Sequence, residues 1–170
     1  MALHRRFLLA TVPALALSAC GFQLRRTPDF AFRSIYVALL PAVKTSALAD
    51  ELKRAIASEG RVQVLTEARQ MPTADVVLDL LVDQREKVVV GVSASGQVRE
   101  FQLRVRLKFR LRTPQDHELI PETELLQQRD FSYNETAALA KEAEEGMLYR
   151  SMQSDLVQQV LRRLAAVRQP

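Results

Sequence analysis

Residues 98–112 read VREFQLRVRLKFRLR, and this stretch carries the clearest structural signal in the sequence. From residue 101 to residue 112, apolar and polar side chains alternate without a break. The apolar members are Phe101, Leu103, Val105, Leu107, Phe109 and Leu111, and the polar members are Gln102, Arg104, Arg106, Lys108, Arg110 and Arg112. Because successive side chains of a β-strand point to opposite faces, this period of two predicts a strand with one buried face and one cationic face.

Further strands are predicted on both sides of this one. In residues 75–90 we expect the apolar side chains on one face and the aspartates on the other, namely Val76, Leu78, Leu80 and Val82 against Asp75, Asp79 and Asp83. The segment GVSASG (91–96) predicts a turn in which two glycines can supply positive φ angles. After a second turn at TPQD (113–116), residues 122–133 are predicted to form another strand.

The remaining segments predict one more strand and two helices. Residues 33–40 have the composition of a strand that ends at Pro41, and residues 62–65 are expected to be a short extended piece. Residues 45–59 follow helical spacing, with Thr45 or Ser46 as the N-cap and Gly60 in the left-handed conformation at the end. A long helix is predicted over residues 135–167, capped by Asn134. Its apolar stripe is Leu148, Met152, Leu156, Val160, Leu161 and Leu164.

The order of these elements, β-α-β-β-β-α, predicts the fold class. We expect an α+β two-layer sandwich, in which a four-stranded mixed sheet carries two helices on one face. The first strand–helix–strand unit is expected to be a right-handed parallel crossover.

The first 20 residues, MALHRRFLLATVPALALSAC, have the layout of a secretory signal peptide. Their apolar stretch, residues 7–17, is shorter than the roughly 20 residues that a membrane-spanning helix needs. The segment LSAC (17–20) resembles the bacterial lipobox. This predicts that residues 1–19 are removed and that Cys20, the only cysteine, receives N-acyl and S-diacylglycerol chains such as palmitate. An ordinary signal peptide with a chance cysteine at the cleavage site is the alternative.

Residues 20–170 are expected to form a single α+β domain that acyl chains hold on a membrane. The sequence has no second long apolar segment, so no membrane-spanning helix is expected. Gly21 follows the cysteine in place of the Asp that retains lipoproteins at the inner membrane. The sequence therefore predicts a lipid anchor in the outer membrane.

The inventory of reactive residues argues against an enzyme. After removal of the signal peptide, His117 is the only histidine, and the chain has neither a glycine-rich phosphate loop nor a GxSxG motif. We therefore expect no catalytic residues, no cofactor and no metal site. The acidic cluster EAEE (142–145) is expected to be solvated charge near a helix N-terminus. The chain has 24 Lys and Arg, two of them in the expected signal peptide, against 20 Asp and Glu, which does not indicate nucleic-acid binding.

Three segments together resemble one protein family. They are CGFQLR (20–25), SGQVREFQL (95–103), and RDFSYN (129–134) followed by ALAKE (138–142). In this order they are similar to the LptE family of lipopolysaccharide (LPS)-assembly lipoproteins. The resemblance implies an outer-membrane lipoprotein that sits as a plug inside a large β-barrel partner, the LPS-assembly protein LptD. It also implies that the two carry LPS to the cell surface.

The same resemblance implies that basic residues near the hairpin tip and at the start of the long helix bind LPS. At the helix start the matching residue is Lys141. At the hairpin tip this chain has Ala94 and Ser95 and no cation, so Arg99 and Arg104 are the nearest substitutes.

From the strand pattern we add Arg106 and Lys108 to the candidate LPS-binding residues, because a row of cations suits the phosphates of LPS. Two alternatives remain open. Glu122 and Glu124 on the next strand could neutralise Lys108 and Arg106, or the row could face solvent or the wall of the barrel. The register of the strands decides between them, and the sequence does not fix that register.

Two other functions are weighed against this one. A lipoprotein that binds cell-wall glycan would normally display aromatic platforms, but the chain has no Trp and only three scattered Tyr. A purely structural barrel plug that does not bind LPS fits the same pattern of elements.

Overall fold

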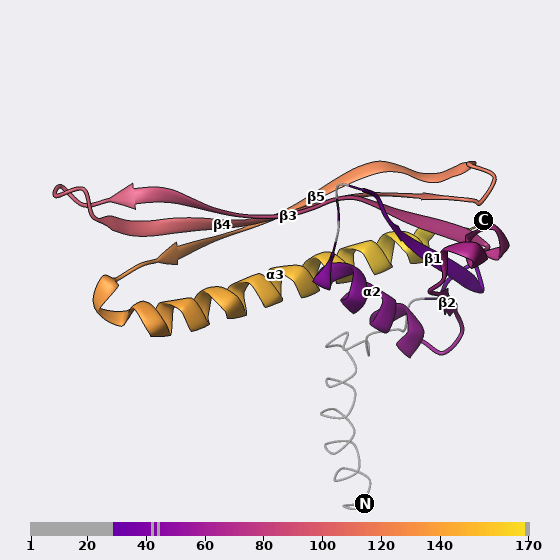
Figure 1. The fold of residues 1–170 in the computed structure, drawn as a ribbon, viewed down its shortest axis with the longest axis horizontal. Coiled ribbons are helices and arrows are strands. Elements are labelled where there is room, and N and C mark those ends of the chain that lie inside the picture. Colours follow the sequence, from indigo (N-terminus) through magenta and orange to yellow (C-terminus); the bar gives the residue numbers. More distant parts are fainter. Residues whose placement is uncertain (1–28, 42, 44, 169–170) are drawn as a thin grey trace, which may run out of the picture.

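The structure is a computed structural model, and it describes residues 29–41, 43 and 45–168. The elements in chain order are β1 (Ser34–Leu39), α2 (Ala47–Ser58), β2 (Gln63–Leu65), a 3-10 helix (Ala68–Thr73), β3 (Val76–Val92), β4 (Val98–Arg112), β5 (Glu118–Ser132), a second 3-10 helix (Glu135–Ala137) and α3 (Ala138–Ala166). Figure 1 shows a long sheet with α2 and α3 on the same face. The predicted signal peptide and Cys20 lie outside the described residues.

The five strands form one mixed sheet in the order β2-β1-β3-β4-β5. β1 pairs parallel with β3, whereas β3, β4 and β5 pair antiparallel. These pairings confirm the α+β class and the mixed sheet. The prediction of four strands is wrong, because residues 63–65 pair parallel with β1 as a fifth strand at the edge. The sequence analysis expected an extended piece at residues 62–65 but did not count it as a strand, because three residues are too short to show a period of two.

The core lies between the sheet and the two helices. On β4 the five apolar residues from Leu103 to Leu111 are fully buried, and the residues between them are not. α3 contributes Met152, Leu156, Val160 and Leu164, and α2 contributes Leu48, Leu52 and Ile56. The alternation in residues 98–112 therefore gave the correct face for every one of these positions. Each such side chain contributes about 1.5–3 kcal/mol by leaving water.

The helix ends follow the predicted capping chemistry. Ser46 caps α2, where its Oγ accepts a hydrogen bond from the backbone N–H of Ala49 at 2.9 Å. Gly60 follows this helix with a φ of 70°. Asn134 accepts a hydrogen bond from the N–H of Thr136, as expected of a cap. The first turn after it is a 3-10 helix, so the α-helix begins at Ala138 and not at residue 135.

An irregularity in β3 overturns the predicted facing of its second half. Leu80 lies opposite Phe109, but Val82 lies opposite Lys108, so the intervening Leu81 has no counterpart on β4. Such a bulge reverses the alternation that follows it. Val82 therefore shares the face of Lys108, not of Leu80. Asp83 lies on the helix-covered face, where its Oδ2 accepts a hydrogen bond from Ser46 at 2.6 Å.

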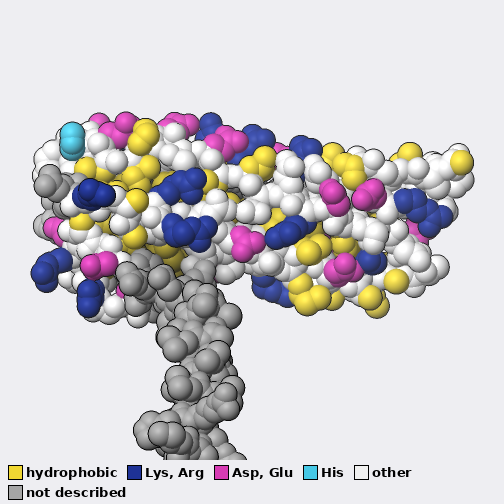
Figure 2. Space-filling view, turned by 180° about the vertical axis from the view of Figure 1, so that it is seen from behind, with side chains coloured by type: hydrophobic (Ala, Val, Ile, Leu, Met, Phe, Trp, Pro, Cys, Tyr) yellow, Lys and Arg dark blue, Asp and Glu magenta, His cyan; other side chains and the backbone are white. Residues whose placement is uncertain are grey.

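The pairing of β4 with β5 ends at Glu100 and Ser132, and from there β3 and β4 continue toward the hairpin tip as a two-stranded ribbon. We call residues 89–99 the hairpin arm. Figure 1 shows its tip extending past the start of α3. At this end of the molecule, hydrophobic side chains lie on the surface (Figure 2), including Val89, Val90 and Val92, which are 47–61% exposed. The arm is thus an apolar surface that the described part of the chain leaves uncovered.

The turn at the tip of the arm uses one glycine as predicted and the other differently. Gly96 has a φ of 80°, which other residues rarely adopt. Gly91 does not have a positive φ, so that part of the prediction is wrong. It lies in β3 beside Glu100, where an added Cβ atom would come within 3.0 Å of the Glu100 Cβ. Close strand approach, not backbone conformation, explains this glycine.

No helix within the described ranges has the length and apolar character that crossing a membrane requires.

Candidate functional site

The five cations from Arg104 to Arg112 form a row along β4 on the face of the sheet that the helices leave uncovered. They alternate with fully buried residues, so all five side chains leave the strand on the same side. The predicted cationic face is therefore present. What it can bind depends on how many of these cations already have a carboxylate partner.

Lys108 and Arg106, in the middle of the row, are paired across the strands. Lys108 Nζ lies 3.3 Å from Glu122 and 3.5 Å from Glu124, and Arg106 Nε lies 3.7 Å from Glu124. The register puts Glu124 directly opposite Lys108. The hydrogen bond to Glu122 raises the pKa of Lys108 above its ordinary value. Cross-strand pairing, the alternative that the sequence left open, is present in the structure.

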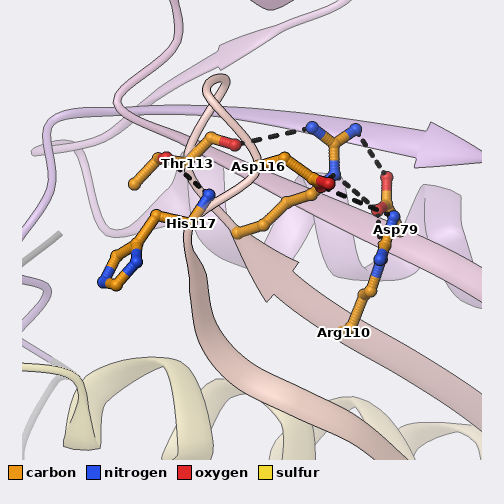
Figure 3. A network of polar contacts seen from close by, with 6 residues as sticks. Asp79, Arg110, Thr113, Asp116 and His117 are labelled. Carbon is orange, nitrogen blue, oxygen red and sulfur yellow. Dashed lines mark hydrogen bonds and ion pairs between the residues drawn. The ribbon is translucent and has the colours of Figure 1, made fainter.

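At the other end of the row, one buried carboxylate holds two arginines (Figure 3). Asp79 on β3 is only 2% exposed, and its Oδ2 accepts hydrogen bonds from the Nε atoms of Arg110 and Arg112, each at 2.8 Å. A second bond, at 3.3 Å, joins Arg112 Nη2 to Oδ1. The hydrogen bond from Arg110 to Asp79 raises the pKa of this arginine. Asp116 extends the cluster at 3.5 Å from Arg112 Nε.

This cluster is structural. Asp116 has a φ of 69° and lies in the β4–β5 turn, where the N–H of Thr113 donates to the carbonyl of His117 at 2.8 Å. The arginines therefore connect β3 to the turn that leads into β5. The sequence analysis placed Asp79 on the polar face but did not identify its role. The signal that could have identified this role is an aspartate within an otherwise apolar strand, followed in the chain by a strand rich in arginine.

Arg104 and Arg99 are the candidate cations with no carboxylate partner among the described residues. Arg104 Nε donates to the Gln102 side chain at 2.8 Å, and Arg99 makes a longer contact of 3.4 Å with Gln97. Arg99 also lines an open hollow of about 170 Å³ between the arm and the turn before α3. The other residues of its lining are Gln97, Val98, Asn134, Glu135 and Thr136.

Lys141 lies across the sheet from Arg104. Its Nζ is 2.9 Å from Glu144, 3.3 Å from Ser132 Oγ and 5.3 Å from the ring centre of Phe131, a residue of the core. The side chain keeps only 20% of its exposure. The structure thus brings Arg104, Arg106 and Lys108 together on the uncovered face and places Lys141 on the helix-covered face.

The sequence analysis missed a polar seam between β3 and the first half of α3. Lys87 Nζ lies 2.6 Å from Glu145 and 4.2 Å from the ring centre of Phe101. The hydroxyl of Tyr149 donates to the Glu86 carbonyl at 2.8 Å, and burial raises the pKa of this tyrosine. The bulge at residue 81 turns Lys87 toward the helix, so a strict period of two hides this contact.

Further along the seam, Gln153 connects the two helices to the sheet. Its amide oxygen accepts a hydrogen bond from Arg85 at 2.5 Å, and its amide nitrogen donates to Glu51 on α2 at 2.6 Å. Within the described ranges, no group of three or more His, Cys, Asp or Glu residues could hold a metal ion.

A family model and several solved structures match this chain. The family model described as "LptE: Lipopolysaccharide-assembly" matches residues 32–164. In the solution structure of the uncharacterized lipoprotein B from Nitrosomonas europaea, the match has a TM-score of 0.71 and 34% identity over 86% of this chain and 91% of that one. None of the curated proteins matches the chain.

Two further solved structures share the fold at lower identity. The rare lipoprotein B from Shewanella oneidensis has a TM-score of 0.61 and 21% identity, with 79% of this chain and 95% of that one covered. The minor lipoprotein from Acinetobacter baumannii has a TM-score of 0.62 and 20% identity, with 84% of this chain and 97% of that one covered.

Proposed function

The chain belongs to the LptE lipopolysaccharide-assembly family, and from this premise we propose that it is an outer-membrane lipoprotein that plugs a large LptD-like β-barrel and helps it assemble. In the same complex it binds LPS during delivery to the cell surface. The observation that carries the proposal is the family match over residues 32–164, which spans the sheet and both helices.

The surface of the molecule supports the role of a plug. The interior of a large outer-membrane barrel is polar. The uncovered face of the sheet is polar too, and most of its cations are neutralised by Glu122, Glu124 and Asp79. Such a face can lie in a hydrated lumen without a large cost for stripping water from unpaired charges.

For LPS binding, we favour Arg99 and Arg104 over the other candidates, because neither has a carboxylate partner among the described residues. Lys141 is paired with Glu144 at 2.9 Å and its side chain is only 20% exposed, so it stays a candidate through the family resemblance alone. LPS phosphates are multivalent anions, and Arg binds phosphate with a two-pronged fork. Lys108 would have to give up its glutamates to bind a phosphate, whereas Arg106 lies 3.7 Å from Glu124 and its Nε makes no hydrogen bond. This pairing is also the observation that favours the second candidate, a structural plug that does not bind LPS.

Purification of the full-length chain from detergent-solubilised outer membranes tests the proposal. We expect one large barrel to co-purify with it, at about one copy per chain. Recovery with peptidoglycan and without a barrel would support the glycan-binding alternative and would contradict the plug.

Cys20→Ala is expected to yield a protein without acyl chains at residue 20. The mass of the mature N-terminus of wild type should show the added N-acyl and S-diacylglycerol groups, since only the cysteine thiol can form the thioether. We do not expect complete loss of function in this variant, because the barrel also holds the plug. An unmodified Cys20 in wild type would refute the lipid anchor.

Lys141→Asp combined with Arg104→Asp is expected to lower LPS affinity and to flatten its salt dependence, because charge-assisted phosphate contacts are screened by ions. The measurement is LPS binding by the soluble chain after Cys20 at two salt concentrations. Circular dichroism checks the fold, and Lys53→Asp on α2 is a control that reverses a single charge away from the candidate residues. A folded double variant that binds LPS as well as wild type would leave a structural plug that carries no lipid.

A further inference from the structure

The hairpin arm exposes a run of valines to water. Residues 88–98 read VVVGVSASGQV, and this segment contains no charged side chain. Val89, Val90 and Val92 are 47–61% exposed. Leu139, in the first turn of α3 at the same end of the molecule (Figure 1), is 83% exposed. A contiguous apolar surface of this kind marks a binding site on a folded protein.

Apolar side chains lie on both faces of this ribbon. Val89 is paired with Phe101, whose ring packs against the core, so Val89 points to the side of the sheet that carries the helices. Val88, at the base of the arm, is paired with Gln102 and therefore points to the uncovered face. Because α3 begins short of the tip (Figure 1), nothing in the described part of the chain covers either face there.

The occupant of such a surface has to be apolar and has to reach both faces. The interior of a large outer-membrane barrel is polar, so a position against the lumen wall would leave the valines beside water or polar side chains. A folded protein surface covers one face of a ribbon at a time. Flexible acyl chains can lie along both faces, and they form the apolar part of LPS.

A cation at the base of the arm suits the anionic part of the same ligand. The Arg99 guanidinium makes a contact of 3.4 Å with Gln97 and has no carboxylate partner among the described residues. Lys87, also at the base, is already held by Glu145 at 2.6 Å. A ligand with both a phosphate and apolar chains can therefore place the phosphate at Arg99 and the chains along the arm.

We propose that the hairpin arm inserts among the acyl chains of an LPS molecule, while Arg99 binds a phosphate of the same molecule. The inference rests on the proposed function, because LPS is the ligand it names. It deepens that function by assigning the lipid part of LPS to the arm. The family resemblance implies a cation near the hairpin tip, where this chain has Ala94 and Ser95. In this chain, therefore, the tip recognises the acyl chains and not the phosphates.

Two triple variants separate apolar contact from side-chain shape. Val89, Val90 and Val92 are changed together to Thr in one variant and to Ile in the other. Thr keeps the branched Cβ and the strand preference of Val but replaces a methyl group by a hydroxyl, whereas Ile keeps the apolar character. A photo-crosslinking amino acid at Ala94, exposed at the tip, reports which molecule lies beside the arm in cells that make the full-length chain. The same amino acid at Gln115, exposed in the β4–β5 turn, is the matched control.

We expect an LPS adduct from position 94 that is several-fold stronger than from position 115. The adduct should persist in the Ile variant and fall about fivefold in the Thr variant, since three half-exposed valines lose their apolar contact. Both variants should recover the barrel as wild type does.

Three results would overturn the inference and leave the plug intact. They are adducts at position 94 only with the barrel, a phospholipid or a second copy of this chain, equal LPS adducts from the Thr and Ile variants, and equal LPS adducts from positions 94 and 115. If the chain with native valines gives no LPS adduct and recovers no barrel, the inference and the proposed function both fall.

Discussion

Replacing Asp79 by alanine is expected to lower the free energy of unfolding by about 2–3 kcal/mol. Asp79 is 2% exposed and accepts hydrogen bonds from both Arg110 and Arg112. Without it, two guanidinium groups lose their buried partner, and the link from β3 to the β4–β5 turn is lost. The loss stays below the ~3–5 kcal/mol of a fully buried pair, because the Arg110 side chain keeps 37% of its exposure.

Urea unfolding of the soluble chain after Cys20, followed by circular dichroism, measures this difference. Asp29→Ala is a suitable control, because Asp29 pairs with Arg61 at 3.3 Å with both side chains more than 80% exposed. Exposed pairs of this kind contribute less than about 1 kcal/mol. Equal stability of the Asp79 and Asp29 variants would show that the cluster in Figure 3 does not stabilise the fold.

Depletion of the chain from the cell is expected to reduce correctly assembled barrel several-fold and to lower surface LPS with it. A plug binds the folded barrel and not the unfolded one, so it stabilises the folded state by mass action. At a concentration of 100 times Kd this stabilisation is about 2.7 kcal/mol. Changes of about 1–2 kcal/mol already alter the abundance of a protein several-fold.

The fraction of barrel with the gel mobility of the folded form, with and without depletion, measures this effect. An unrelated outer-membrane barrel in the same cells is the control and should not change. Normal barrel levels and normal surface LPS after complete depletion would show that the chain is not needed for assembly.

The main strand and its facing could be predicted because period-two alternation over residues 101–112 is a local property of the sequence. The capping of α2 by Ser46 and of the 3-10 turn before α3 by Asn134 is local in the same sense. The facing of β3 beyond Leu80 could not be predicted, because a bulge depends on how two strands fit together. The strand at residues 63–65 was missed for a related reason, since its pairing with β1 is made by the sheet and not by its own three residues.

In the candidate site, too, local features could be predicted from the sequence, and features that depend on strand pairing could not. The cationic row was readable from alternation, but its neutralisation depends on the register that sets Glu124 opposite Lys108. The sequence alone also could not show that Lys141 and Arg104 lie on opposite faces of the sheet. Arg104 lies opposite Gln128 of the edge strand β5, and Lys141 contacts Ser132 of the same strand. An LPS molecule that contacts both cations must therefore reach from one face of the sheet to the other, so the two residues form one site only if the ligand is large.

The most direct test of the central claim, that this protein stabilises its barrel partner, is thermal unfolding of the purified barrel in detergent at increasing concentrations of the full-length chain. We predict that the unfolding temperature of the barrel rises with chain concentration and levels off at one chain per barrel, as mass action requires. An unfolding temperature that stays constant at concentrations where the two proteins co-purify would contradict the account.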